Sequence, residues 1–258
     1  MLSLTTLIRE RDTSANELCV RMGVAALPEL SSLYDEENNI TRILAIEAAS
    51  HIDLAVTHEL IFKALDDEDI NVIHAAIAAI EKHQANISTT LLKELVDKLT
   101  NPDTKNRIIL LLGQRLTVGE AGLLDKYCTV EHPQSIALHC MAALAKIGVE
   151  LRRQQFGAYL LSIKSNPVAF NEVLTLVKYI DQSWLLPTLR LLLNNKESVQ
   201  GLSTTFFDYP HSLRVCDKAV LLIARILKFE FSFDTKRHKN FTNEQLAEVN
   251  LAASNYHY

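Results

Sequence analysis

The sequence predicts an all-α fold, a right-handed α-solenoid of about six helix pairs that forms one domain over residues 1–258. Two observations support this prediction. An apolar residue followed by a polar turn recurs about every 32 residues, which is the spacing of stacked two-helix units that bury their apolar faces against their neighbours. Glycine (7) and proline (6) are scarce in the chain, and β-branched runs are few, so strands and hairpins have little support.

Six apolar residues close the predicted units, and a polar turn follows each of them. The intervals between these closing residues are 32, 34, 29, 35 and 30 residues, so the period is loose but sustained. The closing residues are Leu33, Leu65, Leu99, Cys128, Ile163 and Leu193.

Each unit is expected to contain a first helix, a polar turn and a second helix. Residues 1–15 are expected to cap the N-terminal end, residues 16–227 to form the repeats, and residues 228–258 to cap the C-terminal end, because terminal repeats must shield an open core. The predicted pairs are 16–33 with 40–52, 54–65 with a helix starting near 70, 88–99 with 105–116, 119–128 with 133–147, 152–163 with 167–180, and 184–193 with 213–227.

Local signals support several of these boundaries. Ser88 precedes an apolar stripe as a helix N-cap does, and Pro102, Pro133 and Pro167 stand where second helices begin, a position that tolerates the missing N–H. Pro28 lies inside the first predicted helix and should kink or split it. At the C-terminal end, Thr242 with Gln245 predicts a capping box for a helix over residues 242–253.

The segment 65–80 carries a family resemblance. An acidic turn leads into Val72, a run of small residues and the closing Ile80, and this pattern resembles the core of a HEAT-like repeat of bacterial type. The segment 213–219 resembles the closing repeat of such proteins. Ile73 departs from the pattern, because the family usually carries Arg or Lys after the valine. The resemblance covers most of residues 16–227 and identifies an architecture, not an activity.

No motif in the chain indicates catalysis. The sequence lacks H-E-x-x-H, G-x-S-x-G and a glycine-rich phosphate loop, so we expect a non-enzymatic protein without cofactor or metal.

The four cysteines lie far apart, without a C-x-x-C pair, and are expected to remain thiols within apolar helices. The chain has no signal-peptide pattern and no apolar run of about 18 residues. We therefore expect a cytoplasmic protein without membrane contact.

Charge is unevenly distributed along the chain. The net charge is −5, but residues 1–100 carry 8 basic against 17 acidic residues, a net of −9. Much of this excess lies in two equivalent turns of adjacent units, which stacking would place along one edge. We expect a partner-binding acidic edge there, outside the apolar stripes, so that charge reversal should leave folding intact. The alternative is a set of solvated turns that cap helices, the role we expect for Asp69. The candidate residues are Asp35, Glu36, Glu37, Asp66, Asp67, Glu68 and Asp69.

The sixth unit carries an insertion at residues 194–212, where a short turn is expected. This insertion contains Phe206, Phe207 and Tyr209. Because exposed aromatic clusters are costly, these side chains are expected either to plug the end of the solenoid or to anchor a partner.

The leading functional hypothesis is non-catalytic protein–protein binding to a partner with a basic contact surface. The resemblance extends to immunity proteins that neutralise a cognate toxin. The alternative is a HEAT-like nucleic-acid-binding protein of the DNA-glycosylase type, using a groove lined by Arg107, Arg115, Lys146 and Lys178. The acidic net charge and the single tryptophan disfavour nucleic acid. A third possibility is a HEAT-like lyase or chaperone that acts on a chromophore-bearing protein.

Overall fold

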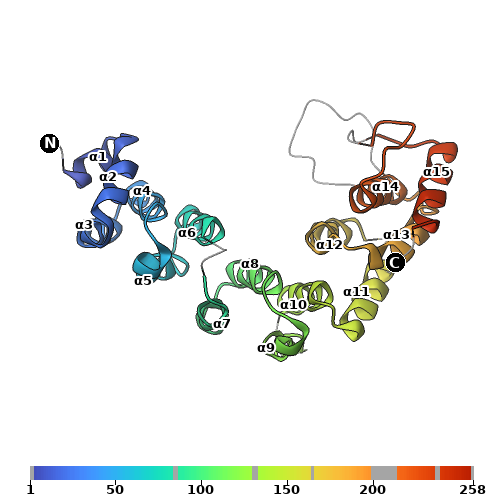
Figure 1. Ribbon diagram of the computed structural model, residues 1–258, viewed down its shortest axis with the longest axis horizontal. Coiled ribbons are helices and arrows are strands. Elements are labelled where there is room, and N and C mark those ends of the chain that lie inside the picture. The colour runs from blue at the N-terminus through green and yellow to red at the C-terminus, as the bar shows by residue number, and fades with distance from the viewer. Residues whose placement is uncertain are drawn as a thin grey trace. The chain divides into compact units, whose positions relative to one another are not determined.

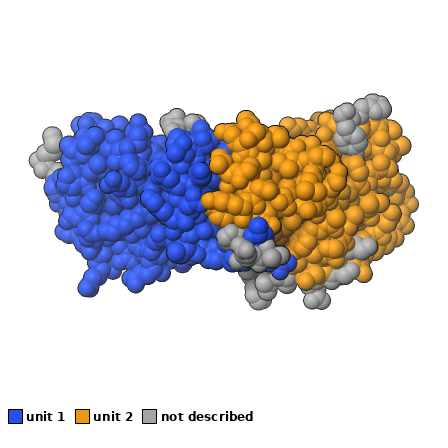
Figure 2. All heavy atoms as spheres, turned by 90° about the horizontal axis from the view of Figure 1, so that it is seen from below, with its two compact units in different colours: residues 1–116, 129–137 blue, residues 117–128, 138–258 orange. Residues whose placement is uncertain are grey.

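The computed structural model describes residues 3–83, 87–129, 133–163, 166–198, 214–235 and 239–256, with backbone only for residues 167 and 168. Every regular element in these ranges is a helix (Figure 1), so the all-α prediction is confirmed. The chain divides into two compact units (Figure 2). Unit 1 comprises residues 1–116 and 129–137, and unit 2 comprises residues 117–128 and 138–258.

Unit 1 is built from pairs of consecutive helices. α3 packs on α4, α5 on α6, and α7 on α8, while the second helices of neighbouring pairs also touch, α4 with α6 and α6 with α8 (Figure 1). The N-terminal α1 and α2 pack against α4. The bounds are α1 Leu4–Arg9, α2 Ser14–Met22, η1 Gly23–Ala26, α3 Leu27–Tyr34, α4 Asn39–Ala49, α5 Leu54–Ala64, α6 Ile70–Lys82, α7 Thr89–Lys98 and α8 Pro102–Gly113.

Capping side chains set where the helices of unit 1 begin. The side-chain oxygens of five N-cap residues accept hydrogen bonds from the first turns of α4 to α8, which satisfies backbone N–H groups that have no partner within the helix. Ser88 is among them, as predicted. The caps are Asn38, Asp53, Asp69, Ser88 and Asn101.

Small apolar residues let the second helices of unit 1 approach one another. Ala45 and Ala49 of α4 are fully buried, as are Ala76 and Ile80 of α6. Alanine at such contacts brings helix axes close while keeping the interior densely packed. The alternation of alanine with large aliphatic residues in α6 therefore fits a helix with a neighbour on each side.

Pro28 divides the first predicted helix, as expected. Gly23 ends α2 with φ of +53°, a left-handed conformation that glycine adopts without a Cβ penalty. The chain then forms the short η1, and Pro28 lies in the first turn of α3, where its missing N–H costs nothing.

Unit 2 contains η2 Val118–Glu120, α9 Gly122–Asp125, most of α10 Gln134–Ile147, α11 Glu150–Ser162, α12 Pro167–Ile180, η3 Ser183–Leu185, α13 Leu186–Leu192, α14 Val215–Leu227 and α15 Asn243–Ser254. α13 packs against α11, α14 and α15. The predicted helix 119–128 is wrong in length, because Gly119 and Gly122 weaken it and only short helical turns form. The predicted helix 184–193 begins as a 3₁₀ turn.

In the C-terminal part of unit 2, a non-helical segment after α14 precedes the last helix, α15. α14 ends at Leu227, its C-cap residue Lys228 has φ of +50°, and residues 228–235 are not helical. Thr242 and Gln245 form the predicted capping box at the start of α15. Among the residues that the structure describes, no helix combines the length and apolarity needed to cross a bilayer.

Candidate functional site

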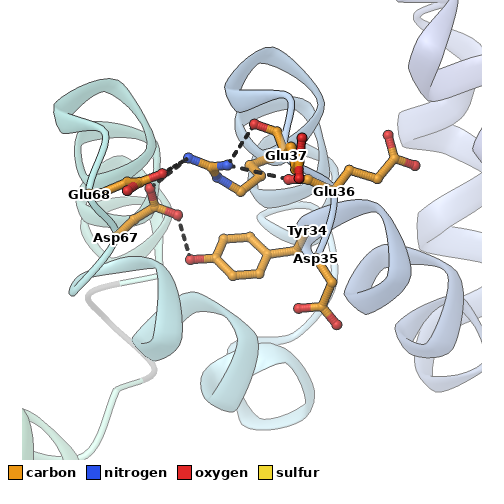
Figure 3. Close-up of a pocket in the computed structure, with 7 residues that line it drawn as sticks. Tyr34, Asp35, Glu36, Glu37, Asp67 and Glu68 are labelled. Atoms are coloured by element: carbon orange, nitrogen blue, oxygen red, sulfur yellow. Dashed lines mark hydrogen bonds and ion pairs between the residues drawn. The ribbon is translucent and has the colours of Figure 1, made fainter.

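The strongest candidate site is an open hollow in unit 1 between the equivalent turns of two adjacent helix pairs (Figure 3). The turn after α3 and the turn before α6 lie together because α3 packs on α4 and α4 packs on α6. We define the acidic hollow by the residues that line it, which are Tyr34, Asp35, Glu36, Glu37, Asn38, Asn39, Arg42, Asp67, Glu68 and Asp69.

Arg42 of α4 is one of the residues that line the acidic hollow, and its guanidinium joins the two turns. Its Nη1 donates to the backbone carbonyls of Glu36 and Glu37, at 3.3 and 3.0 Å. Its Nη2 donates to Asp67 Oδ1 at 3.1 Å and lies 3.7 Å from Glu68 Oε1. The guanidinium fork thus fixes a turn on one side and a carboxylate on the other. The Nε of Arg42 is buried and has no hydrogen-bond partner.

Asp67 is an internal carboxylate. Its Oδ1 also accepts the backbone N–H of Asp69 at 2.9 Å, and its Oδ2 accepts the hydroxyl of Tyr34 at 2.7 Å. Burial opposes ionisation, but the hydrogen bonds from Asp69, Tyr34 and Arg42, together with the charge of Arg42, outweigh it and lower the pKa of Asp67. Asp67 is therefore a structural anion at neutral pH.

Tyr34 forms the floor of the acidic hollow. Burial, followed by the hydrogen bond to Asp67 and the charge of that carboxylate, raises the pKa of Tyr34. The phenol therefore stays protonated and serves as a donor. The ammonium of Lys63 lies 5.1 Å from the centre of the Tyr34 ring, at cation–π distance.

Three other carboxylates have local partners. Asp69 caps α6 by accepting the N–H of Asn71 at 2.8 Å, which confirms the capping role expected for it. A hydrogen bond from Asn39, followed by that from Asn71, lowers the pKa of Asp69. Asp35 pairs with Lys63 at 2.7 Å, and Glu36 pairs with Arg9.

The remaining acids, Glu37, Asp66 and Glu68, are exposed to solvent, and Glu68 also lies at ion-pair distance from Arg42. All three are exposed, and the Glu68 side chain retains 89% of its accessibility. The expectation that every turn acid lies outside the packed structure is wrong for Asp67, whose side chain is only 6% exposed. It turns inward because Arg42 and Tyr34, which belong to the preceding helix pair of unit 1, hydrogen-bond to it.

The charge balance of this surface is negative. Around the two turns, seven carboxylates face the three cations Arg9, Arg42 and Lys63, which leaves an excess of four negative charges. Across the residues that the structure describes, no three His, Cys, Asp or Glu side chains come together in a way that could hold a metal ion. The acids around Arg42 hold a guanidinium and helix ends instead.

The other predicted residues have different outcomes. Phe206, Phe207 and Tyr209 lie outside the described residues. The described ends of their insertion lie together, because the N–H of Val215 donates to Glu197 O and that of Cys216 donates to Asn195 O, both at 2.9 Å.

The basic residues named for the groove are partly engaged in internal contacts. In unit 1, Arg107 pairs with Glu81 at 2.8 Å. In unit 2, the Lys146 ammonium donates to the carbonyls of Tyr179 and Ile180 at the end of α12. Lys146 therefore satisfies carbonyl groups at the C-terminal end of α12.

Sequence reasoning missed Arg42 and Tyr34. A signal existed for both, since Tyr34 directly follows the closing Leu33, and Arg42 is the single charged residue in the first two turns of its helix. A basic residue just after an acidic turn indicates a partner for that turn. No protein-family model and no curated protein matches the chain, so the HEAT-like resemblance rests on the repeat pattern.

Proposed function

We propose that this protein binds another protein without catalysis, and that the acidic hollow contacts a basic surface on the partner. We further propose that its helix pairs stack as a right-handed HEAT-like solenoid. The pairing of α3 with α4, α5 with α6 and α7 with α8, with contacts between successive second helices, supports this arrangement in unit 1.

One observation carries the proposal. The acidic hollow combines an immobilised centre with exposed charges around it. Arg42, Asp67 and Tyr34 fix the two turns, while Glu37, Asp66 and Glu68 remain in solvent. A surface whose backbone is already ordered loses little entropy on binding, and its excess negative charge accelerates encounter with a positive partner.

The partner class follows from this charge. A protein with a basic contact face fits, and among the proteins that the HEAT-like pattern resembles, immunity proteins bind toxins. A toxin that acts on nucleic acid carries such a basic face, because its substrate is a polyanion. We therefore propose a basic, nucleic-acid-directed toxin as the partner to test first.

The test uses two variants with the same change in charge. In the first, Glu37, Asp66 and Glu68 are changed to Lys. In the control, the exposed acids Glu17, Glu59 and Glu94 of the same unit are changed to Lys. A partner captured by the wild-type protein is identified by mass spectrometry, and its association rate with each variant is measured at low and high salt.

The hollow variant should associate about tenfold more slowly or worse at low salt, and the deficit should shrink at high salt because screening weakens the wild-type attraction. The control variant should lose much less. If both variants associate equally slowly, the effect comes from net charge and not from the acidic hollow. If the hollow variant associates as fast as the wild type, the partner contacts another surface.

A further inference from the structure

Unit 2 contains a second open hollow, with a volume of about 490 Å³. Arg153 of α11 and Trp184 of η3 are the largest side chains that line it, and Gln182, Ser183 and Pro187 complete the lining. We call it the Arg–Trp hollow. It shares no residue with the acidic hollow of unit 1, so each can bind a partner without the other. Tryptophan and arginine together are typical of protein recognition sites.

Trp184 is held in place from within the unit. Its indole N–H donates to Gln182 Oε1 at 2.7 Å, and its ring packs edge to face with Phe156, with 6.5 Å between the ring centres. Gln182 is itself oriented, because its Nε2 donates to the carbonyl of Lys146 at 2.9 Å. Trp184 is nonetheless only half-buried. An aromatic surface is therefore ordered in advance and still open to solvent, which lowers the entropic cost of binding.

Arg153 lies over this ring. Its Cζ is 5.6 Å from the centre of the Trp184 ring, at cation–π distance. Its Nε donates to the carbonyl of Ala145 at 3.2 Å, and its Nη2 donates to Gln182 Oε1 at 3.5 Å. The guanidinium is therefore oriented by neutral groups.

The charge of Arg153 is weakly neutralised. Among the described residues its ion-pair partner is Glu150, whose Oε2 lies 3.9 Å from Nη1 and whose side chain is 69% exposed. This distance is too long for a hydrogen bond. Arg214 of the same unit, in contrast, lies 2.8 Å from the buried carboxylate of Asp217. Nη1 of Arg153 thus has donors that a ligand can use.

Apolar atoms surround this cation. Pro187 is exposed, and Val118 is 57% exposed. Val118 borders the guanidinium, because its Cγ2 and Arg153 Nη2 each lie 3.5 Å from the place where a Cβ on Gly148 would stand. The hollow therefore suits a group that is anionic at one end and apolar at the other.

We propose that the Arg–Trp hollow binds an acidic segment of a partner protein, by means of a carboxylate that lies beside an aliphatic side chain. The carboxylate accepts from Nη1 of Arg153 and replaces the long ion pair with Glu150, while the aliphatic group packs on Trp184 and Pro187. Arg153 is the single cation among the lining residues, so one negative charge matches it better than a phosphate dianion does.

The chain provides its own probe for this site. Trp184 is its single tryptophan, so tryptophan fluorescence reports on the Arg–Trp hollow alone. Three peptides distinguish the sources of a carboxylate. Acetyl-Leu-Glu-Leu-amide carries one on a side chain, acetyl-Leu-Gln-Leu with a free C-terminus carries one at its end, and acetyl-Leu-Gln-Leu-amide carries none.

At least one of the two charged peptides should change the fluorescence saturably, with a dissociation constant of about 1 mM. The uncharged peptide should bind about tenfold more weakly, because it lacks the charged acceptor for Arg153. Whichever charged peptide binds more tightly identifies the carboxylate as a side-chain or a terminal one. Equal binding of the uncharged peptide, or no response to any peptide at about 10 mM, would overturn the proposal.

Two variants with the same change in charge locate the contact. Arg153→Gln should weaken binding of the charged peptide about tenfold and leave the uncharged peptide unaffected. The control is Lys196→Gln, beyond the C-terminal end of α13, where Lys196 donates to Asn243 at 3.0 Å. It should bind within about twofold of wild type. Equal losses in both variants would assign the attraction to net charge and overturn the proposal. If Arg153→Gln does not fold, the charged and uncharged peptides on the wild type decide the question.

Discussion

Arg42 and Asp67 form an ion pair that joins two consecutive helix pairs of unit 1, with 3.1 Å between Nη2 and Oδ1 and side chains that are 10% and 6% exposed. The same guanidinium holds the carbonyls of the preceding turn. One side chain therefore sets the spacing between the turn after α3 and the turn before α6. The acidic surface keeps its shape because this cation lies beneath it.

Replacing Arg42 should be strongly destabilising. In Arg42→Met, Asp67 stays buried without its cation and two turn carbonyls lose their donor, so we expect the free energy of unfolding to fall by about 3–5 kcal/mol. Arg9→Met is the matched control, because Arg9 pairs with Glu36 in solvent and should cost about 0–1 kcal/mol. Urea unfolding followed by circular dichroism measures both. A similar small loss in the two variants would contradict the structural role of Arg42.

The stability that Asp67 contributes should depend on pH in one direction. Its pKa is lowered in the folded protein from the ordinary 3.8. Its contribution is therefore fully present above that value and is lost as pH falls through the folded pKa. Asp67→Asn should cost about 2 kcal/mol at neutral pH, and the difference from wild type should shrink at about pH 3. Urea midpoints at the two pH values test this, and a difference that stays constant with pH would contradict it.

Arg214 and Asp217 should anchor the C-terminal segment of unit 2. Asp217 is fully buried, its Oδ1 accepts the N–H of Phe241 at 2.9 Å, and Arg214 Nη2 donates to the carbonyl of Phe241 at 2.7 Å. Asp217→Ala removes one of these bonds and the partner of Arg214. We expect chymotrypsin to cleave around Phe233 about tenfold faster than in wild type, because the free energy of locally unfolding this segment becomes smaller.

The control for that experiment is Glu244→Ala, which removes an exposed acid from the first turn of α15. Its cleavage rate should match that of wild type. If Asp217→Ala is cleaved no faster than this control, Arg214 and Asp217 do not anchor the C-terminal segment.

The sequence predicts local structure better than it predicts contacts between one helix pair and the next. Ser88 as a cap, the break at Pro28 and the Thr242–Gln245 box were readable because each acts within one helical turn. The hydrogen bond between Tyr34 and Asp67 joins residues that are 33 positions apart, and no local sequence pattern predicts it. Asp67 therefore looked like one more surface acid in an acidic run.

The phenylalanines of the C-terminal segment should differ sharply in their contribution to stability. Phe229, Phe231, Phe233 and Phe241 form a continuous series, with consecutive ring centres 5.0, 5.6 and 5.5 Å apart. The series runs from Phe229, which is 55% exposed, to Phe241, which is 2% exposed. Phe241→Ala should lower the free energy of unfolding by about 3–5 kcal/mol, because it removes a buried ring and leaves a cavity.

Phe229→Ala is the matched substitution at the other end of the series and should change stability by less than about 1 kcal/mol, because solvent already reaches half of that ring. Urea unfolding of both variants under identical conditions measures the contrast. Equal losses would mean that Phe229 is buried in solution by a contact that this chain alone does not provide. Comparing the loss at several protein concentrations would then show whether a second copy supplies that contact, since stability gained by association rises with concentration.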